Sequence, residues 1–102
     1  MDQGTNGPVS SIAIAADNRV YVGGTFEMAG GTAVNNIALW EDGSWAALTD
    51  TDTGTPGTNN EVRAISIDAN GHVYIGGNFD SAGGGTAPRI AVWDGTDWDT
   101  LG

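Results

Sequence analysis

Two stretches of the chain carry one pattern: residues 20–48 read VYVGGTFEMAGGTAVNNIALWEDGSWAAL, and residues 73–101 read VYIGGNFDSAGGGTAPRIAVWDGTDWDTL. Sliding the sequence against itself by 53 residues aligns them without a gap and places tryptophan on tryptophan twice. Self-similarity at a fixed offset indicates a tandem repeat. We therefore divide the chain into a first repeat with its following linker, residues 1–53, and a second repeat, residues 54–102. The alignment extends toward the N-terminus, where Val9, Ile12 and Ile14 fall on Val62, Ile65 and Ile67.

Each repeat holds four short strand signals separated by turn signals and has no helical period. The first strand mixes β-branched residues with Ala and Ser, as expected when both faces are packed, and we place it innermost. Four strands in a repeat of this length are typical of a β-propeller blade. The sequence therefore predicts an all-β fold with two four-stranded antiparallel blades per chain. The expected strands are 10–16, 19–24, 37–40 and 44–48 in the first repeat, and 63–69, 72–77, 90–93 and 97–101 in the second.

An Asp-Gly pair lies in the last hairpin of each repeat, at Asp42-Gly43 and at Asp94-Gly95. Such pairs favour tight turns. The pair is displaced by one residue between the repeats, whereas the spacing of the two tryptophans is unchanged. We therefore expect two different turn types with the same strand register.

Composition narrows the possible partners. The chain has 102 residues, 17 Gly, no Cys and a net charge of −10. Nucleic acids and anionic membranes are held by Lys and Arg, so neither is an expected partner. The first residues lack the basic and apolar regions of a signal peptide, and the sequence leaves the localisation open.

Two blades are few for a propeller, because a blade is covered on both faces by its neighbours and rings of about four to eight blades are typical. Repeats without neighbours or polar caps expose their apolar sides, so we expect association. Residues 4–6 repeat residues 57–59 of the linker, which places the start of the chain inside a linker and favours head-to-tail packing. A closed cyclic homo-oligomer then has six, eight or ten blades. An eight-bladed tetramer is the leading expectation, with a trimer as the alternative.

The blade pattern resembles repetitive bacterial propellers whose blades read VYVGGxFxxAGGxxxxxIAxWDGxxWxxLG, a group similar to kelch-like and cortical-marker propellers. The resemblance covers almost the whole chain, although such proteins carry many blades in one polypeptide. It implies the propeller fold and little about chemistry. The two-blade length and the start inside a linker favour an excised or designed fragment with a structural role. Propellers host binding, scaffolding and catalysis alike, so the function has to be argued from sites.

The phenylalanines and tryptophans, six residues in all, recur at equivalent places in the two repeats and are candidates for packing between blades. We expect Phe26 and Phe79 to fill space between blades. Tryptophan faces also suit apolar sugar faces, so a carbohydrate-binding propeller is an alternative function. Their regular placement in strands favours interblade packing over sugar binding. The four tryptophans are Trp40, Trp45, Trp93 and Trp98.

The linker between the repeats offers one candidate metal site. Asp50, Asp52 and Glu61 occupy positions 1, 3 and 12 of a calcium-loop pattern. The match is partial, because Thr55 stands where the pattern needs glycine and Gly54 supplies no side-chain ligand. Calcium-assisted assembly is therefore a further alternative, set against a solvated polar linker.

Catalytic groups are scarce. His72 is the one histidine, and Arg19 is its counterpart in the other repeat. Asp97 and Asp99 alternate on the last expected strand, where such charges protect a sheet edge. We expect no enzyme activity and no cofactor other than the possible calcium.

Overall fold

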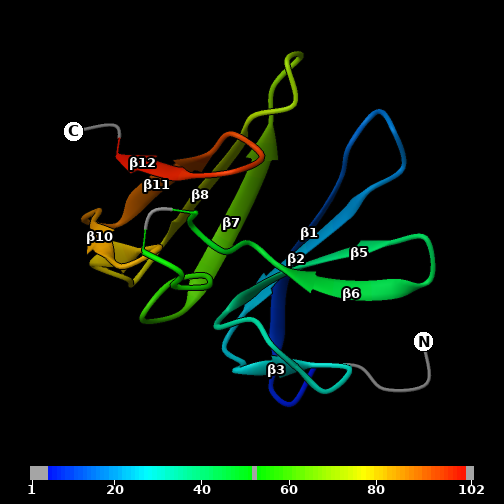
Figure 1. Ribbon diagram of the computed structural model, residues 1–102, viewed down its shortest axis with the longest axis horizontal. Helices are drawn as coiled ribbons and strands as arrows, with labels where there is room; N and C mark the ends of the chain where they lie inside the picture. Colours follow the sequence, from blue (N-terminus) through cyan, green and yellow to red (C-terminus); the bar gives the residue numbers. More distant parts are fainter. Residues whose placement is uncertain (1–4, 52, 101–102) are drawn as a thin grey trace.

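The computed structural model describes residues 5–51 and 53–100 and contains two blades built alike (Figure 1). In blade 1 the main sheet has the strand order β1-β2-β5-β6, and a small hairpin, β3–β4, stands beside it. In blade 2 the order is β7-β8-β11-β12, with the hairpin β9–β10. All neighbouring strands are antiparallel, which confirms the predicted all-β propeller fold. The strands of blade 1 are β1 Val9–Ile14, β2 Val20–Gly24, β3 Met28–Ala29, β4 Thr32–Ala33, β5 Ile37–Glu41 and β6 Ser44–Ala47; those of blade 2 are β7 Val62–Ile67, β8 Val73–Gly77, β9 Ser81–Ala82, β10 Gly85–Thr86, β11 Ile90–Trp93 and β12 Trp98–Thr100.

The last hairpins differ in turn and agree in register, as the sequence predicts. Trp40 pairs with Trp45 in blade 1, and Trp93 pairs with Trp98 in blade 2. The blade 1 turn is the two-residue loop 42–43, in which both residues have positive φ, of 52° and 83°. That conformation matches the right-handed twist of the strands. The blade 2 turn is the longer loop 94–97, closed by a hydrogen bond from the residue 94 amide to the residue 97 carbonyl oxygen at 3.1 Å.

The glycine pair at the end of the second strand has a steric cause. A Cβ on Gly77 would lie 2.1 Å from the carbonyl oxygen of Glu61, and one on Gly24 would lie 2.1 Å from that of Pro8. At the same point the register of each blade's first two strands shifts, as in a β-bulge. The chain entering each blade therefore crosses directly over the second strand, and a side chain there would block it.

The first strands of the two blades lie next to each other, while β6 and β12 lie on opposite sides (Figure 1). This agrees with the expected inner position of the first strand in each blade. The expectation that both of its faces are packed is not met: in β7 Ala64 and Ser66 are exposed, and β1 is more open still. Ile12 is 62% exposed and Ile14 is 68% exposed, because one side of β1 has no blade against it.

Candidate functional site

A buried apolar cluster joins the two blades. Blade 1 contributes Tyr21, Ile37 and Leu48, each at most 3% exposed. Blade 2 contributes the opposing side of its sheet. Gly23 of blade 1 faces Val62, and a Cβ on this glycine would lie 2.6 Å from the Val62 Cγ1 atom. The blades are therefore closely packed, and the hollow left by a glycine accommodates a valine. The blade 2 members are Val62, Val73, Ile75, Phe79, Ala82, Ala87, Ala91, Trp93 and Trp98.

The outer face of blade 1 repeats the side of blade 2 that is buried in this cluster. Val62 is 0% exposed, whereas its counterpart Val9 is 44% exposed. Ile12 and Ile14 are more than half exposed, whereas their counterparts in β7 are partly buried against the shared cluster. Burial here depends on whether a second blade is present and not on residue type. We call Val9, Ile12 and Ile14 the blade 1 outer face.

The outer face of blade 2 corresponds to the surface of blade 1 that is buried against blade 2. Ile37 is fully buried between the blades, whereas its counterpart Ile90 is 43% exposed. Gly23 is buried, whereas its counterpart Gly76 is only partly so. The nearest atom to a Cβ built on Gly76 is a backbone oxygen 3.6 Å away. The hollow that Val62 fills at the internal junction is therefore open here, and we call Ile90 with Gly76 the blade 2 outer face.

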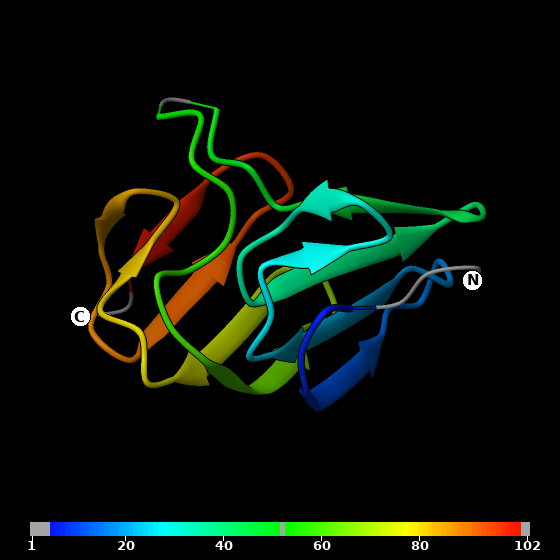
Figure 2. The same ribbon diagram turned by 90° about the horizontal axis from the view of Figure 1, so that it is seen from below.

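The linker, residues 49–61, runs between the small hairpins of the two blades and is drawn in green in Figure 2. On the blade 1 side, Asn35 Nδ2 donates to the carbonyl oxygen of Pro56 at 3.2 Å, and Asn36 Nδ2 donates to that of Thr58 at 3.0 Å. The Thr58 amide donates back to the carbonyl oxygen of Asn35 at 3.0 Å. On the blade 2 side, Thr58 forms an antiparallel bridge with Ala82. The linker is thus hydrogen-bonded to both blades at once.

An asparagine that occurs in both repeats holds the chain against the small hairpin of each blade. Asn59 Oδ1 accepts from the amides of Asp80 and Ser81 at 3.0 and 3.1 Å. Its counterpart Asn6 accepts from the amides that precede and begin β3, at 2.9 and 3.1 Å. The N-terminal segment therefore lies on blade 1 as the internal linker lies on blade 2.

The residues of the calcium hypothesis have separate contacts. Asp50 is 7% exposed, and its carboxylate accepts from the amides of Trp98 at 3.0 Å and Thr53 at 3.3 Å. Glu61 Oε1 instead accepts from Asn78 Nδ2 at 3.1 Å, beside the end of β8. Asp52 lies outside the described residues. Within residues 5–51 and 53–100, no group of three carboxylate or imidazole side chains could hold a metal ion. Calcium binding stays a prediction.

The aromatic residues occupy two environments. Phe79, Trp93 and Trp98 belong to the cluster shared by both blades, and Trp98 Nε1 donates to the Leu48 carbonyl oxygen at 2.9 Å. Phe26 is buried in a second cluster within blade 1, and Trp45 packs against that cluster. Trp40 is partly exposed and contacts the Trp45 ring, with centroids 5.1 Å apart. Sugar binding stays a prediction, with Trp40 as the more accessible surface.

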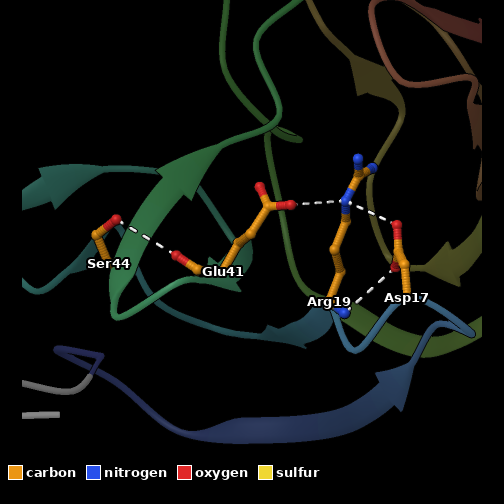
Figure 3. Close-up of polar contacts among 4 residues, drawn as sticks. All are labelled: Asp17, Arg19, Glu41 and Ser44. Carbon is orange, nitrogen blue, oxygen red and sulfur yellow. Dashed lines mark hydrogen bonds and ion pairs between the residues drawn. The ribbon is translucent and has the colours of Figure 1, made fainter.

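Charged residues surround the turn between β1 and β2 (Figure 3). Arg19 Nε lies 2.9 Å from Glu41 Oε2 and 3.2 Å from Asp17 Oδ2, and all three side chains are at least 41% exposed. The pKa of Arg19 is raised, mainly by a hydrogen bond with Tyr21 and to a smaller extent by one with Glu41. Ser44 Oγ donates to the backbone oxygen of Glu41, within the adjacent hairpin. These ion pairs connect the turn to the end of β5, and because they are exposed they contribute little to stability.

The equivalent place in blade 2 holds a histidine. His72 Nδ1 lies 3.4 Å from Asp68 Oδ2, and the Asp68 carboxylate accepts from the His72 and Asn70 amides and from Tyr74 Oη. These hydrogen bonds, the His72 amide first, lower the pKa of Asp68. The carboxylate is thus engaged in holding a turn, and neither turn presents a nucleophile beside a base.

Two shallow grooves of about 280 and 350 Å³ lie along the linker. Both are bordered by Glu27, Asn36 and Asn59. The amide groups of Asn36 and Asn59 are already hydrogen-bonded to backbone or to Asp80. These two asparagines therefore serve to hold the linker and loops in place.

Comparison with known proteins identifies the blade type. The DUF5122 β-propeller, a domain of unknown function, matches residues 15–44 and 69–91, which is more than half of the chain. The chain belongs to this β-propeller family. The two-component regulator propeller also matches, over residues 56–79. No curated protein and no solved structure matches the chain. The kelch-like assignment is finer than these matches, which support propeller repeats in general.

Sequence reasoning missed the residues that hold the linker. The sequence predicts no role for Asn36, and for Asp50 it offers a calcium site or a solvated linker but no contact with the Trp98 amide. The recurrence of Asn6 at Asn59, within the matching tripeptides 4–6 and 57–59, was the available signal for the linker contacts. No comparable signal existed for Asp50, whose partner Trp98 is 48 residues away.

Proposed function

We propose that this chain is a structural module that assembles head to tail with its own copies into a closed propeller ring. The observation that carries the proposal is the pair of outer faces. Val9 and Ile90 are 44% and 43% exposed, while their counterparts at the internal junction, Val62 and Ile37, are fully buried. Large exposed apolar side chains gathered on a sheet face are typical of a protein interface.

The most suitable occupant of each outer face is a second copy of the chain. The blade 1 outer face is the repeat equivalent of the surface that blade 2 presents to blade 1. The blade 2 outer face is the equivalent of the surface that blade 1 presents in return. A second copy therefore offers each face a partner whose shape complementarity is exemplified at the internal junction, where Val62 fills the hollow at Gly23.

A head-to-tail contact leaves one free face at each end of a growing assembly until the ring closes. With two blades per chain, closure gives an even number of blades. A tetramer with eight blades lies within the usual range of about four to eight and is our leading expectation, with a six-bladed trimer as the alternative. The proposed role is structural and requires no ligand.

Native mass spectrometry of the chain at micromolar concentration tests the proposal. We expect one discrete oligomer of three to five copies for the wild type. Ile12→Asp places a charge on the blade 1 outer face and should give a monomer, because burying an unpaired carboxylate is costly. Ala46→Asp is the matched control, since Ala46 is exposed on β6 and its counterpart in blade 2 is already Asp99. A folded wild-type monomer at tens of micromolar would overturn the proposal.

A further inference from the structure

The loop before β11 repeats backbone hydrogen bonds of the loop that holds the linker, although Pro88 stands in place of Asn35, whose φ of 56° proline cannot adopt. Asn36 has φ of 74° and donates its amide to the Phe26 carbonyl oxygen; Arg89 has φ of 67° and donates to that of Phe79. A second hydrogen bond is repeated as well. The Gly24 amide donates to the Asn36 carbonyl oxygen at 3.0 Å, and the Gly77 amide donates to the Arg89 carbonyl oxygen at 3.1 Å. The residue that clamps the internal linker thus has a counterpart in the same conformation, exposed at the edge of the blade 2 outer face.

Arginine in this place has a conformational cost. Positive φ is uncommon outside glycine and asparagine, and a strained residue points to a function when the surroundings hold it there. Asn36 both accepts, from the Phe26 amide at 3.1 Å, and donates, to Thr58 at 3.0 Å. The Arg89 side chain has no acceptor atom and can only donate. The replacement keeps the donor function and adds a positive charge on a longer arm.

The other half of the clamp is present at the N-terminal end. Thr5 forms an antiparallel bridge with Ala29 of β3, as Thr58 does with Ala82 of β9. The hydroxyl of Thr5 donates to the backbone two residues ahead at 2.8 Å, and that of Thr58 does the same at 2.7 Å. Thr5 therefore occupies on blade 1 the position that Thr58 occupies on blade 2. At that position the carbonyl oxygen of Thr58 accepts from Asn36 Nδ2.

We propose that Arg89 of one copy donates to the carbonyl oxygen of Thr5 in the adjoining copy, while the Pro88 carbonyl oxygen accepts from the Thr5 amide. This inference rests on the proposed function and specifies how the copies are joined. The Pro88 contact repeats the bond from the Thr58 amide to the Asn35 carbonyl oxygen, which needs no side chain. A hydrogen bond from a guanidinium is stronger than one from a neutral amide. The junction between copies thus gains a charged bond where the internal junction has a neutral one.

The test measures the dissociation constant between copies by mass photometry over a dilution series. Arg89→Ala removes the donor and should raise this constant about tenfold at each interface. Arg89→Asn restores an amide as in Asn36 and should recover most of the affinity. Arg19→Ala is the control for loss of one positive charge, because Arg19 lies in a turn of blade 1 that faces blade 2 of the same chain. It should change the constant less than threefold. Circular dichroism of the diluted variants checks that each is folded.

A second readout follows the Thr5 amide. Its hydrogen exchange should be slow in the assembled wild type and in Arg89→Asn, and faster in Arg89→Ala at equal occupancy of the ring. If Arg89→Ala keeps the wild-type constant and slow exchange while Ile12→Asp abolishes the oligomer, the ring is correct and the clamp is wrong. If the wild type is a monomer, both proposals fail.

Discussion

Substituting the equivalent isoleucines Ile37 and Ile90 by alanine tests whether the two junctions are alike. Ile37 is fully buried in the cluster between the blades. Removing three carbons from such a site costs about 3 kcal/mol, within the range of roughly 2 to 5 for buried isoleucine. For a domain of this size, each 1 kcal/mol lowers Tm by about 4 to 8 °C, so Ile37→Ala should lower Tm by about 12 to 24 °C.

Ile90→Ala should behave differently at low and high concentration. In a diluted monomer, Ile90 is 43% exposed, so its loss should cost only about 1 kcal/mol and about 4 to 8 °C. In a ring, Ile90 is buried as Ile37 is, and the remaining cost of about 2 kcal/mol weakens association. The dissociation constant should then rise about thirtyfold.

Thermal unfolding by circular dichroism, repeated from submicromolar to high micromolar concentration, separates these effects because association makes Tm concentration-dependent. Wild-type Tm should rise with concentration, and the rise should start at higher concentration in Ile90→Ala. Ile37→Ala should have a lower Tm at every concentration. Equal concentration dependence in the wild type and Ile90→Ala would refute the equivalence of the two junctions.

Four further substitutions probe single contacts. Gly23→Ala should lower Tm by several degrees, because the added Cβ meets Val62. Gly76→Ala should leave the Tm of the diluted monomer within about 2 °C of the wild-type value and should weaken association. Thermal unfolding measures the first effect and mass photometry the second. Asp68→Asn tests a depressed carboxyl pKa. The stabilisation by Asp68 is fully present above the unfolded pKa of about 3.9 and is lost as pH falls through the lower folded pKa. The wild-type advantage in Tm should therefore begin to shrink below about pH 4, and a gap at pH 2 as large as that at neutral pH would contradict the assignment. Asp50→Ala should lower the free energy of unfolding by about 1 to 3 kcal/mol, because it leaves the Trp98 amide without its acceptor. EDTA should leave the wild-type melting curve unchanged. A fall in Tm with EDTA in the wild type, but not in Asp50→Ala, would instead establish the calcium site.

The sequence predicts local structure well where short-range chemistry decides it. Asp42-Gly43 adopts a two-residue turn with positive φ at both positions because aspartate and glycine tolerate that conformation. In blade 2 the displaced pair begins a four-residue turn in which the Asp94 carboxylate accepts from the amides of Thr96 and Asp97. Both turns leave the tryptophan pairing intact, which could be deduced from spacing alone.

Contacts between blades could not be deduced in this way. A carboxylate in a polar linker can bind a cation or accept from backbone amides, and only the packing of blade on blade brings the Trp98 amide to Asp50. Exposure is equally nonlocal. Ile37 and Ile90 have the same residue type and the same place in the repeat, yet one is fully buried and the other is 43% exposed. Their difference comes from the presence or absence of a neighbouring blade.

The two outer faces differ in shape, and this difference restricts how copies can meet. The blade 1 outer face presents protruding side chains at Ile12 and Ile14, which are 62% and 68% exposed. The blade 2 outer face includes Gly76, where a Cβ would have only one atom within 4 Å. A two-fold symmetric dimer joins a face to itself, so it would oppose protrusions or leave two hollows unfilled. Pairing the protrusions with the hollow joins unlike faces, so each open assembly still has one free blade 1 outer face and one free blade 2 outer face. In the proposed assembly, further copies are added until the last blade 2 outer face meets the first blade 1 outer face. This predicts a closed ring without a stable dimer.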